Sequence, residues 1–332
     1  MSALQVTWFI IIGLFLTVYA ILDGFDLGAG FWHLFVKKDE ERRTLLSAIG
    51  PFWDGNEVWL LTGGGAIFAA FPHVYATVFS GMYLALMLVI FSLIFRALSI
   101  EFRNKVDSDR WRKFWDVSFA IGSMLPAILF GVAAGNVLRG MELNSVMNYS
   151  GTFLDLLNPY ALLAGLLSFS LFALHGAAYL AWKTTGDLPL QARRWAYMAG
   201  IASAAIFALF FISTIITQPH LMQNYYKHFY LWLLPLMALA ALLKVLHSNV
   251  RGEDRNAFLA SSFSIAAIMA TMAVMLFPNT VIALGNPGLN LTVMNSSSSP
   301  LTLTVMLIIA AIGMPLVISY HVWSYKLWKE MI

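Results

Sequence analysis

Residues 159–182 read PYALLAGLLSFSLFALHGAAYLAW, a run of 24 positions without Asp, Glu, Lys or Arg. A helix of about 20 apolar residues spans the roughly 30 Å hydrocarbon core of a bilayer, so this run is long enough to cross a membrane. His175 is its only basic side chain. The stretch predicts a transmembrane helix, and the rest of the chain repeats the pattern.

The overall composition also indicates a membrane protein. Of the 332 residues, 60% are hydrophobic and only 11% are charged, against roughly 25% charged in a typical soluble domain. A soluble fold of this length has too little interior to bury so much apolar surface. The composition therefore excludes a soluble globular protein, a disordered chain and a nucleic-acid-binding protein. The chain has no cysteine, which excludes disulfides, iron–sulfur clusters and thiolate chemistry.

The hydropathy pattern predicts an all-α polytopic protein with nine transmembrane helices. Their boundaries carry an uncertainty of about two to four residues. The first span begins with residues too poor in positive charge for a cleaved signal peptide, so we expect it to be retained. The predicted spans are 7–35, 52–71, 73–97, 114–138, 159–182, 195–216, 229–247, 257–277 and 301–326.

Basic residues gather on one side of this topology. With nine spans, 18 of the 20 Lys and Arg residues fall in alternate connections, counted with their helix edges, or in the C-terminal end; only Arg139 and Lys227 fall on the opposite side. Cytoplasmic loops collect Lys and Arg. We therefore expect the N-terminus outside and the C-terminus in the cytoplasm.

A weak internal repeat divides the chain. Leu22-Asp23-Gly24 resembles Leu174-His175-Gly176, and each is followed by a paired arginine 17 or 18 residues later. Copies four spans apart share an orientation and are related by an axis along the membrane normal. The repeat predicts a four-helix bundle over residues 1–138, a second over 159–277, and a peripheral ninth helix with the C-terminus over 301–332.

Most of the 17 acidic residues lie in the predicted cytoplasmic loops or at helix ends, and four do not. Asp23 and Asp26 belong to the first span, and Asp54 and Glu57 to the beginning of the second. Each pair has i, i+3 spacing and shares one helix face, and both pairs lie toward the cytoplasmic side. Four ionised carboxylates would repel one another, so we expect some to be protonated near neutral pH, as a proton relay requires. The alternative is structural, with these side chains capping kinked or starting helices.

His175 is the one histidine well inside a span. Haem and metal sites need more than one ligand, and no second histidine lies at helical spacing from it. We expect a buried polar contact or relay residue, and no metal site on this chain.

Several motifs resemble subunit II of the cytochrome bd-type quinol oxidases. The similarity extends over nearly the whole chain, in order. It is carried by Leu22-Asp-Gly-Phe-Asp-Leu-Gly28, Trp53-Asp-Gly-Asn-Glu-Val-Trp-Leu60, Ile67-Phe-Ala-Ala-Phe-Pro72, Arg96 with Glu101-Phe-Arg103, Gly135-Asn136, Leu157-Asn158-Pro159, His175-Gly176-Ala177 and Ser298-Ser-Pro-Leu-Thr-Leu303.

This resemblance implies a respiratory enzyme of the bacterial plasma membrane that oxidises quinol and reduces oxygen to water. It implies that two b-type haems and one d-type haem, with the quinol-oxidising loop, reside on a partner, subunit I. It further implies a pseudo-symmetric heterodimer in which subunit II binds no haem and in some members holds a quinone, here near His175. Small single-span accessory subunits and membrane lipids are further expected partners.

The resemblance also gives the carboxylates a role in supplying cytoplasmic protons for water formation. By matching motif, Asp54 with Trp53 is the first candidate for proton uptake, followed by Asp23 and Asp26. Glu57 stands where some relatives have glutamine, and the residue before Trp53 is phenylalanine instead of their histidine. A pathway through that histidine cannot be identical here.

The residues alone leave two other functions open. A proton-coupled secondary transporter would also use carboxylates on the inner side and a parallel repeat, although matched Gly/Pro-interrupted spans with a substrate site are missing. A purely structural membrane scaffold would use the acids only as caps.

Overall fold

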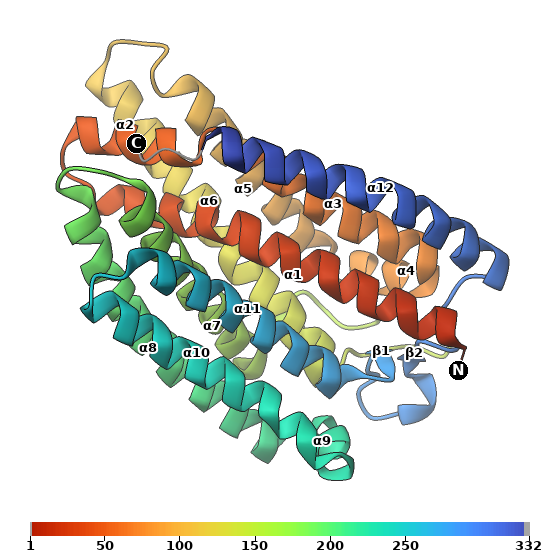
Figure 1. Ribbon diagram of the computed structural model, residues 1–332. Helices are drawn as coiled ribbons and strands as arrows, with labels where there is room; N and C mark the ends of the chain where they lie inside the picture. Colours follow the sequence, from red (N-terminus) through yellow and green to blue (C-terminus); the bar gives the residue numbers. More distant parts are fainter. Residues whose placement is uncertain (1, 329–332) are drawn as a thin grey trace.

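The computed structural model describes residues 2–328 and is almost entirely helical. Lys329 and the rest of the C-terminal tail lie outside the described residues. Long helices run side by side, with the start of α1 at one end of the molecule and the end of α12 toward the other (Figure 1). The long helices are α1 (Ala3–Trp32), α3 (Trp53–Ala70), α5 (Tyr83–Phe102), α6 (Asp109–Arg139), α7 (Pro159–Lys183), α8 (Leu188–Thr217), α10 (Leu233–Val250), α11 (Asp254–Leu276) and α12 (Pro300–Leu327).

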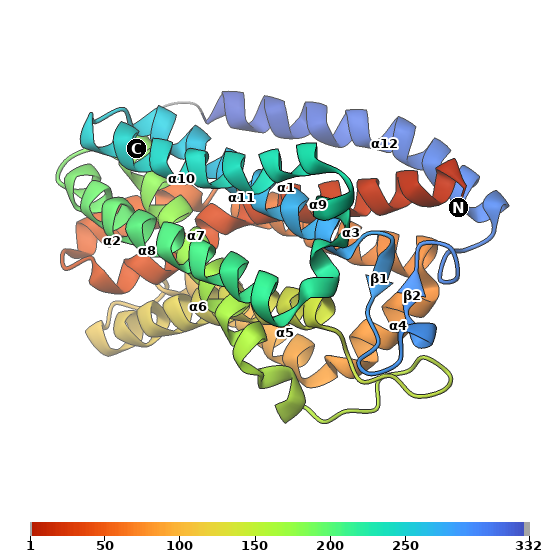
Figure 2. The same cartoon turned by 90° about the horizontal axis from the view of Figure 1, so that it is seen from below.

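Short elements close the two ends. We call the end that carries α2 and the last turn of α12 the basic end, because the predicted cytoplasmic connections gather there (Figure 1). At the opposite end two short antiparallel strands lie near α4 (Figure 2). The short elements are α2 (Asp39–Ile49), α4 (Pro72–Gly81), α9 (Gln223–Lys227), β1 (Asn279–Val281), β2 (Leu291–Thr292) and the 3₁₀ turns His33–Phe35, Leu154–Leu157, Pro219–Met222, Phe229–Trp232 and Pro287–Leu289.

Eight helices in the described range are long and apolar enough to cross a membrane. The exception among the nine predicted spans is α3, whose first two turns carry Asp54, Asn56 and Glu57. The all-α membrane fold is confirmed, whereas the count of nine spans stays a prediction. The predicted span 73–97 is two helices, since α4 ends at Gly81 and α5 starts at Tyr83.

The connection 36–51 contains a helix that the hydropathy pattern did not predict. This helix, α2, begins with three acidic residues, which favour a helix N-terminus. Its buried side chains include Leu45, Leu46 and Ile49. It is an amphipathic helix that covers the basic end of the bundle.

Helices α1 and α7 cross at the centre of the molecule, and glycine residues lie at their contact. A Cβ at Gly28 would lie 1.8 Å from the carbonyl oxygen of Phe172, and one at Gly176 would lie 2.3 Å from the backbone nitrogen of Ala29. Small residues let helix backbones approach this closely in membranes. Buried side chains from α1, α2, α7, α8, α10 and α11 form one continuous core around the crossing. Because that core joins both halves, the division into two four-helix bundles stays a prediction.

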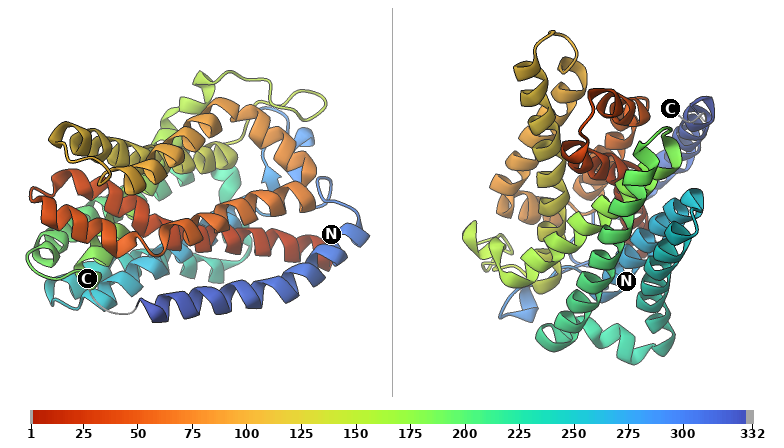
Figure 3. Two further views of the ribbon diagram at one scale, coloured as in Figure 1. Left: turned by 90° about the horizontal axis from the view of Figure 1, so that it is seen from above. Right: turned by 90° about the vertical axis from the view of Figure 1, so that its left-hand side faces the viewer.

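Helix α12 lies at the edge of the bundle in both views of Figure 3. Its only buried side chain among the described residues is Leu303. It packs on α1 and α3. The prediction of a peripheral last helix agrees with this placement.

Candidate functional site

The face of α1 opposite its glycine crossing carries two fully buried carboxylates. Asp23 and Asp26 are both 0% exposed. Asp23 accepts hydrogen bonds from Nη1 and Nη2 of Arg96 on α5, at 2.9 and 2.5 Å. Asp26 Oδ2 accepts one from Nδ2 of Asn56 on α3, at 2.7 Å. The i, i+3 spacing predicted a shared face, and the structure aims that face at α3 and α5.

Besides Asp23, Arg96 contacts a second carboxylate, that of Glu57. Glu57 Oε1 on α3 lies 3.6 Å from Arg96 Nη1, and its side chain is 23% exposed, whereas Asp23 and Arg96 are 0% exposed. One buried guanidinium thus serves two carboxylates, and only Glu57 reaches the protein surface. A proton on Glu57 would leave the three groups electrically neutral.

Unsatisfied polar atoms surround this cluster. Among the described residues, Asp26 Oδ1, Glu57 Oε1, Arg96 Nε and Tyr19 Oη are buried without a hydrogen-bond partner. Most buried polar atoms in proteins find a partner in protein or ordered water. Several such atoms near one cluster are the setting in which buried water bridges polar groups.

Asn56 links the carboxylates to the last helix. Its Nδ2 also donates to the carbonyl oxygen of Leu22 at 3.0 Å, and its Oδ1 accepts from Oη of Tyr325 on α12 at 3.1 Å. Tyr325 stacks on Phe52 with ring centroids 4.2 Å apart. Helix α12 therefore helps to orient the group that holds Asp26.

The structure places Asp54 outside this cluster. Asp54 is exposed in the first turn of α3, and it forms no hydrogen bond or ion pair within residues 2–328. Trp53 is half-buried beside it. His321 of α12 lies nearby, with Nε2 3.3 Å from the carbonyl oxygen of Gly55 and 3.3 Å from Nε1 of Trp59. Of the four predicted carboxylates, three converge and one faces outward.

His175 lies on α7 within an aromatic pocket beside α1. Its Nε2 lies 2.9 Å from the carbonyl oxygen of Ile21, which only accepts, so this nitrogen carries a proton. Its Nδ1 lies 2.7 Å from Ser261 Oγ, and the ring stacks on Phe258 at 4.7 Å. Both nitrogens are engaged by protein groups, which does not fit an axial haem ligand. The described residues hold no group of three or more His, Asp or Glu side chains placed to bind a metal ion.

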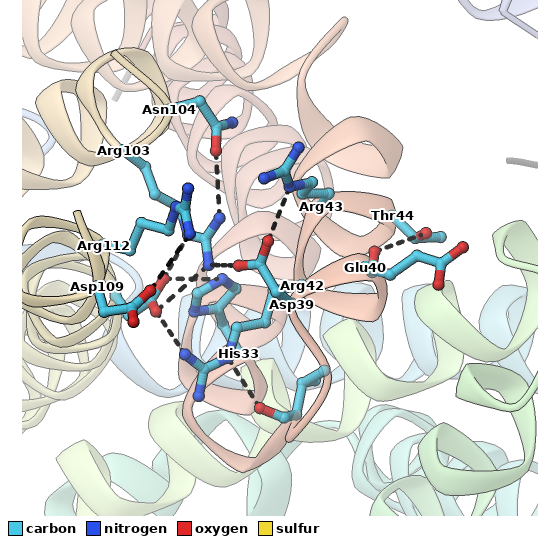
Figure 4. Close-up of polar contacts among 12 residues, drawn as sticks. His33, Asp39, Glu40, Arg42, Arg43, Thr44, Arg103, Asn104, Asp109 and Arg112 are labelled. Carbon is cyan, nitrogen blue, oxygen red and sulfur yellow. Dashed lines mark hydrogen bonds and ion pairs between the residues drawn. The ribbon is translucent and has the colours of Figure 1, made fainter. Parts of the chain in front are cut away.

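A second ionic cluster holds the basic end together (Figure 4). Buried Asp116 of α6 accepts from Arg42 Nη1 and Arg103 Nε, each at 2.5 Å. Arg103 Nη2 also donates to Asp39 of α2 at 2.6 Å. His33 Nε2 lies 3.5 Å from Asp116. The cluster ties α2 to α1 and to the α5–α6 connection.

Arg96, Asn56 and Tyr325 are site residues that pattern reasoning did not select. Arg96 was counted with the cytoplasmic connection, although it follows the apolar run 83–95 inside the same helix. An arginine at that position signals a buried partner, because a lone charge is costly in the membrane. Asn56 and Tyr325 carry no comparable signal.

The model of the family described as cytochrome bd terminal oxidase subunit II matches residues 4–328. The chain belongs to this family. It is 35% identical to the cytochrome bd-I ubiquinol oxidase subunit 2 of Escherichia coli (strain K12), over 99% of this chain and 94% of that protein. It is 34% identical to the cytochrome bd ubiquinol oxidase subunit 2 of Bacillus subtilis (strain 168), over 100% of this chain and 98% of the relative.

Solved structures include the same fold. A chain of the bd oxidase from Geobacillus thermodenitrificans matches with a TM-score of 0.80 at 17% identity, covering 98% of this chain and 99% of that one. The family assignment makes the chain a multi-pass membrane subunit of a cytochrome bd-type quinol oxidase, an oxidoreductase of aerobic respiration. The complex contains haem, a quinol substrate and a partner subunit I. This assignment replaces the transporter hypothesis that the sequence left open.

Proposed function

We propose that this chain is the haem-free subunit of its oxidase and carries cytoplasmic protons toward a haem-bearing subunit I. The observation that supports this most is the convergence of Asp23, Asp26 and Glu57 from two helices at the basic end, around Arg96 and Asn56. Capping alone does not account for it, because these carboxylates bind side chains of other helices.

The route begins at the surface and ends at buried acids. Asp54 and Trp53 collect protons at the exposed start of α3. Glu57, one helical turn further along the same face, receives them beside Arg96. Water bridging the unsatisfied atoms of Glu57, Arg96 and Asp26 then provides the hydrogen-bonded connection. Asp23 and Arg96 supply fixed charge, and Asp26 is the last acid of the series.

The remaining parts of the proposal extend the family assignment. Two b-type haems and one d-type haem lie on subunit I, where electrons from quinol reduce oxygen. A structural quinone on this chain would occupy the aromatic surroundings of His175, and small single-span subunits complete the assembly. The complex lies in the bacterial plasma membrane with the basic end of this chain in the cytoplasm, because Lys and Arg gather there.

The test uses the intact oxidase purified from its native membrane. Asp54→Asn and Glu57→Gln keep size and hydrogen-bonding capacity but cannot exchange a proton at that position. We expect quinol oxidase turnover to fall about tenfold or more, because a positioned proton-transfer group contributes roughly 10²–10⁴-fold. Reduced-minus-oxidised spectra should show unchanged haem content.

Glu40→Gln is the matched control, since Glu40 is an exposed acid on α2 at the same end whose side chain has no partner in the described structure. It should keep full turnover. Normal turnover in both Asp54→Asn and Glu57→Gln would favour the scaffold role. A purified complex without haem would contradict the haem-bearing partner.

A further inference from the structure

A surface groove lies between α8 and α10 at the basic end of the molecule. It is distant in sequence from Asp23, Asp26 and Glu57. The two helices pack side by side (Figure 1). The groove has a volume of about 530 Å³. Its lining residues are Arg193, Arg194, Tyr197, Met198, Asn249 and Val250.

One of its two arginines is already neutralised. Arg193 Nε and Nη2 donate to the two carboxylate oxygens of Asp254, each at 2.7 Å. The turn between α10 and α11 places Asp254 there through Gly252, whose φ of +71° favours glycine. This pair fixes one wall of the groove and leaves no charge on Arg193 for a ligand.

The neighbouring Arg194 has no such partner. It is exposed, and it forms no ion pair or hydrogen bond in the described part of the chain. Tyr197 and Met198 follow at i+3 and i+4, so the three side chains share one face of α8. That face offers a free guanidinium above an exposed aromatic and apolar surface.

Asn249 is a second, independent indication of a ligand. It is only 8% exposed, yet its side-chain amide makes no hydrogen bond within residues 2–328. The amide atoms themselves still reach solvent, because none of them is among the buried polar atoms without a partner. An acceptor bound in the groove would therefore replace water on this amide. Asn249 lines the groove from α10, opposite Arg194.

We propose that this groove binds the head group of an anionic phospholipid from the leaflet at the basic end. The phosphate lies against Arg194 and accepts from the Asn249 amide, while an acyl chain covers Tyr197, Met198 and Val250. Basic pockets between membrane helices on the cytoplasmic side bind such head groups. The apolar floor favours a lipid over free phosphate, which would leave that floor exposed.

The surrounding charges agree with an anionic ligand. Lys244 and Arg251 are exposed at the end of α10. Of the two nearby acids, Asp254 is paired with Arg193, whereas Glu253 accepts a hydrogen bond from the neutral Asn256 at 3.0 Å and keeps its charge. Arg194, Lys244 and Arg251 outnumber that one negative charge. The local field is therefore positive where the head group would lie.

The test measures lipid binding to the intact oxidase by native mass spectrometry, with phosphatidylglycerol titrated against phosphatidylcholine of the same acyl chains. Removing one interfacial arginine costs about fivefold in affinity. We expect Arg194→Gln to weaken phosphatidylglycerol binding about fivefold and Asn249→Ala to weaken it as well. Arg110→Gln is the matched control, since Arg110 is an exposed arginine at the same end without a partner among the described residues.

Three results would overturn the proposal. If the Arg194→Gln variant bound phosphatidylglycerol as tightly as the wild type, the proposed site at Arg194 would be contradicted. Equal binding of phosphatidylcholine would show that head-group charge is not recognised. If millimolar inorganic phosphate displaced the bound lipid, and the acyl chains had no effect on lipid binding, the groove would be a site for free phosphate. Unchanged haem spectra in every variant show that the complex is intact, so this test is independent of the proton-supply proposal.

Discussion

Asp23 on α1 and Arg96 on α5 form an ion pair through two hydrogen bonds, and both side chains are 0% exposed. In such a pair each charge is stabilised mainly by the other, because neither contacts solvent. The pair therefore joins α1 to α5 and also sets the electrostatic surroundings of Glu57. Its loss would have a different effect from the loss of an exposed acid.

Asp23→Asn is expected to destabilise the subunit as well as reduce turnover. It leaves the buried Arg96 guanidinium with Glu57, 3.6 Å away, as its remaining charged partner. Breaking a buried ion pair on one side typically costs about 3–5 kcal/mol. A lowered thermal midpoint and reduced haem content of the purified oxidase would report this loss. Replacing both residues with apolar ones, Asp23→Leu with Arg96→Met, should recover much of the stability but not the turnover. A double variant no more stable than Asp23→Asn would contradict this account of the pair.

Tyr325→Phe isolates the contribution of α12. The substitution removes the hydrogen bond to Asn56 and keeps the ring that stacks on Phe52. We expect a loss of about 1 kcal/mol in stability and a reduced turnover, because Asn56 orients the Asp26 carboxylate. Thermal unfolding and quinol oxidase assays on the same preparation measure both. Tyr320→Phe is the control, since Tyr320 is 60% exposed and has no hydrogen bond in the described structure.

Gly28→Ala should separate α1 from α7. The new methyl group would lie 1.8 Å from the carbonyl oxygen of Phe172, which belongs to the backbone and cannot rotate away. Overpacking of this kind costs about 1–3 kcal/mol and more where backbone must move, so we expect poor yield and a lowered thermal midpoint. Gly65→Ala is the matched control, because a methyl group there would have no atom within 4 Å. Equal yields of the two variants would show that the crossing can widen freely.

The membrane fold could be predicted from the sequence because a long uncharged run such as 159–182 crosses a bilayer as an α-helix, which satisfies its backbone hydrogen bonds internally. Local spacing also predicted that Asp23 and Asp26 share a face. The partner of that face could not be predicted, since Arg96 is 73 residues away and the contact depends on how α1 and α5 pack. The same limit applies to Tyr325, which is 269 residues from Asn56.

The predicted helix boundaries were wrong where a local sequence feature differs from the average hydropathy of the segment around it. The span predicted at 73–97 contains Gly81, where α4 ends before α5 begins. The hydropathy pattern does not predict helix α2, because its mean hydropathy is low. Its acidic start and the spacing of Leu45, Leu46 and Ile49 are nevertheless those of an amphipathic helix. Asp54 is a different case. Its spacing predicts a shared face with Glu57, but its side chain is exposed and has no partner within residues 2–328.

The cluster at the basic end predicts a specific pH dependence of stability. The Arg103 guanidinium, which donates to Asp39, lowers the pKa of that carboxyl below its usual value. A lowered pKa in the folded state means that the stabilisation is present above about pH 4, the unfolded value, and is lost as pH falls through the folded value. Asp39 is 44% exposed, so solvent screening limits its contribution to less than about 1 kcal/mol.

We therefore expect the thermal midpoint of Asp39→Asn to lie slightly below that of the wild type, by a constant amount from about pH 8 to pH 5. The two midpoints should converge below about pH 4. Glu40→Gln, on the same helix, should follow the wild type across this range. A difference that persists unchanged at low pH would show that Asp39 acts through packing instead of charge.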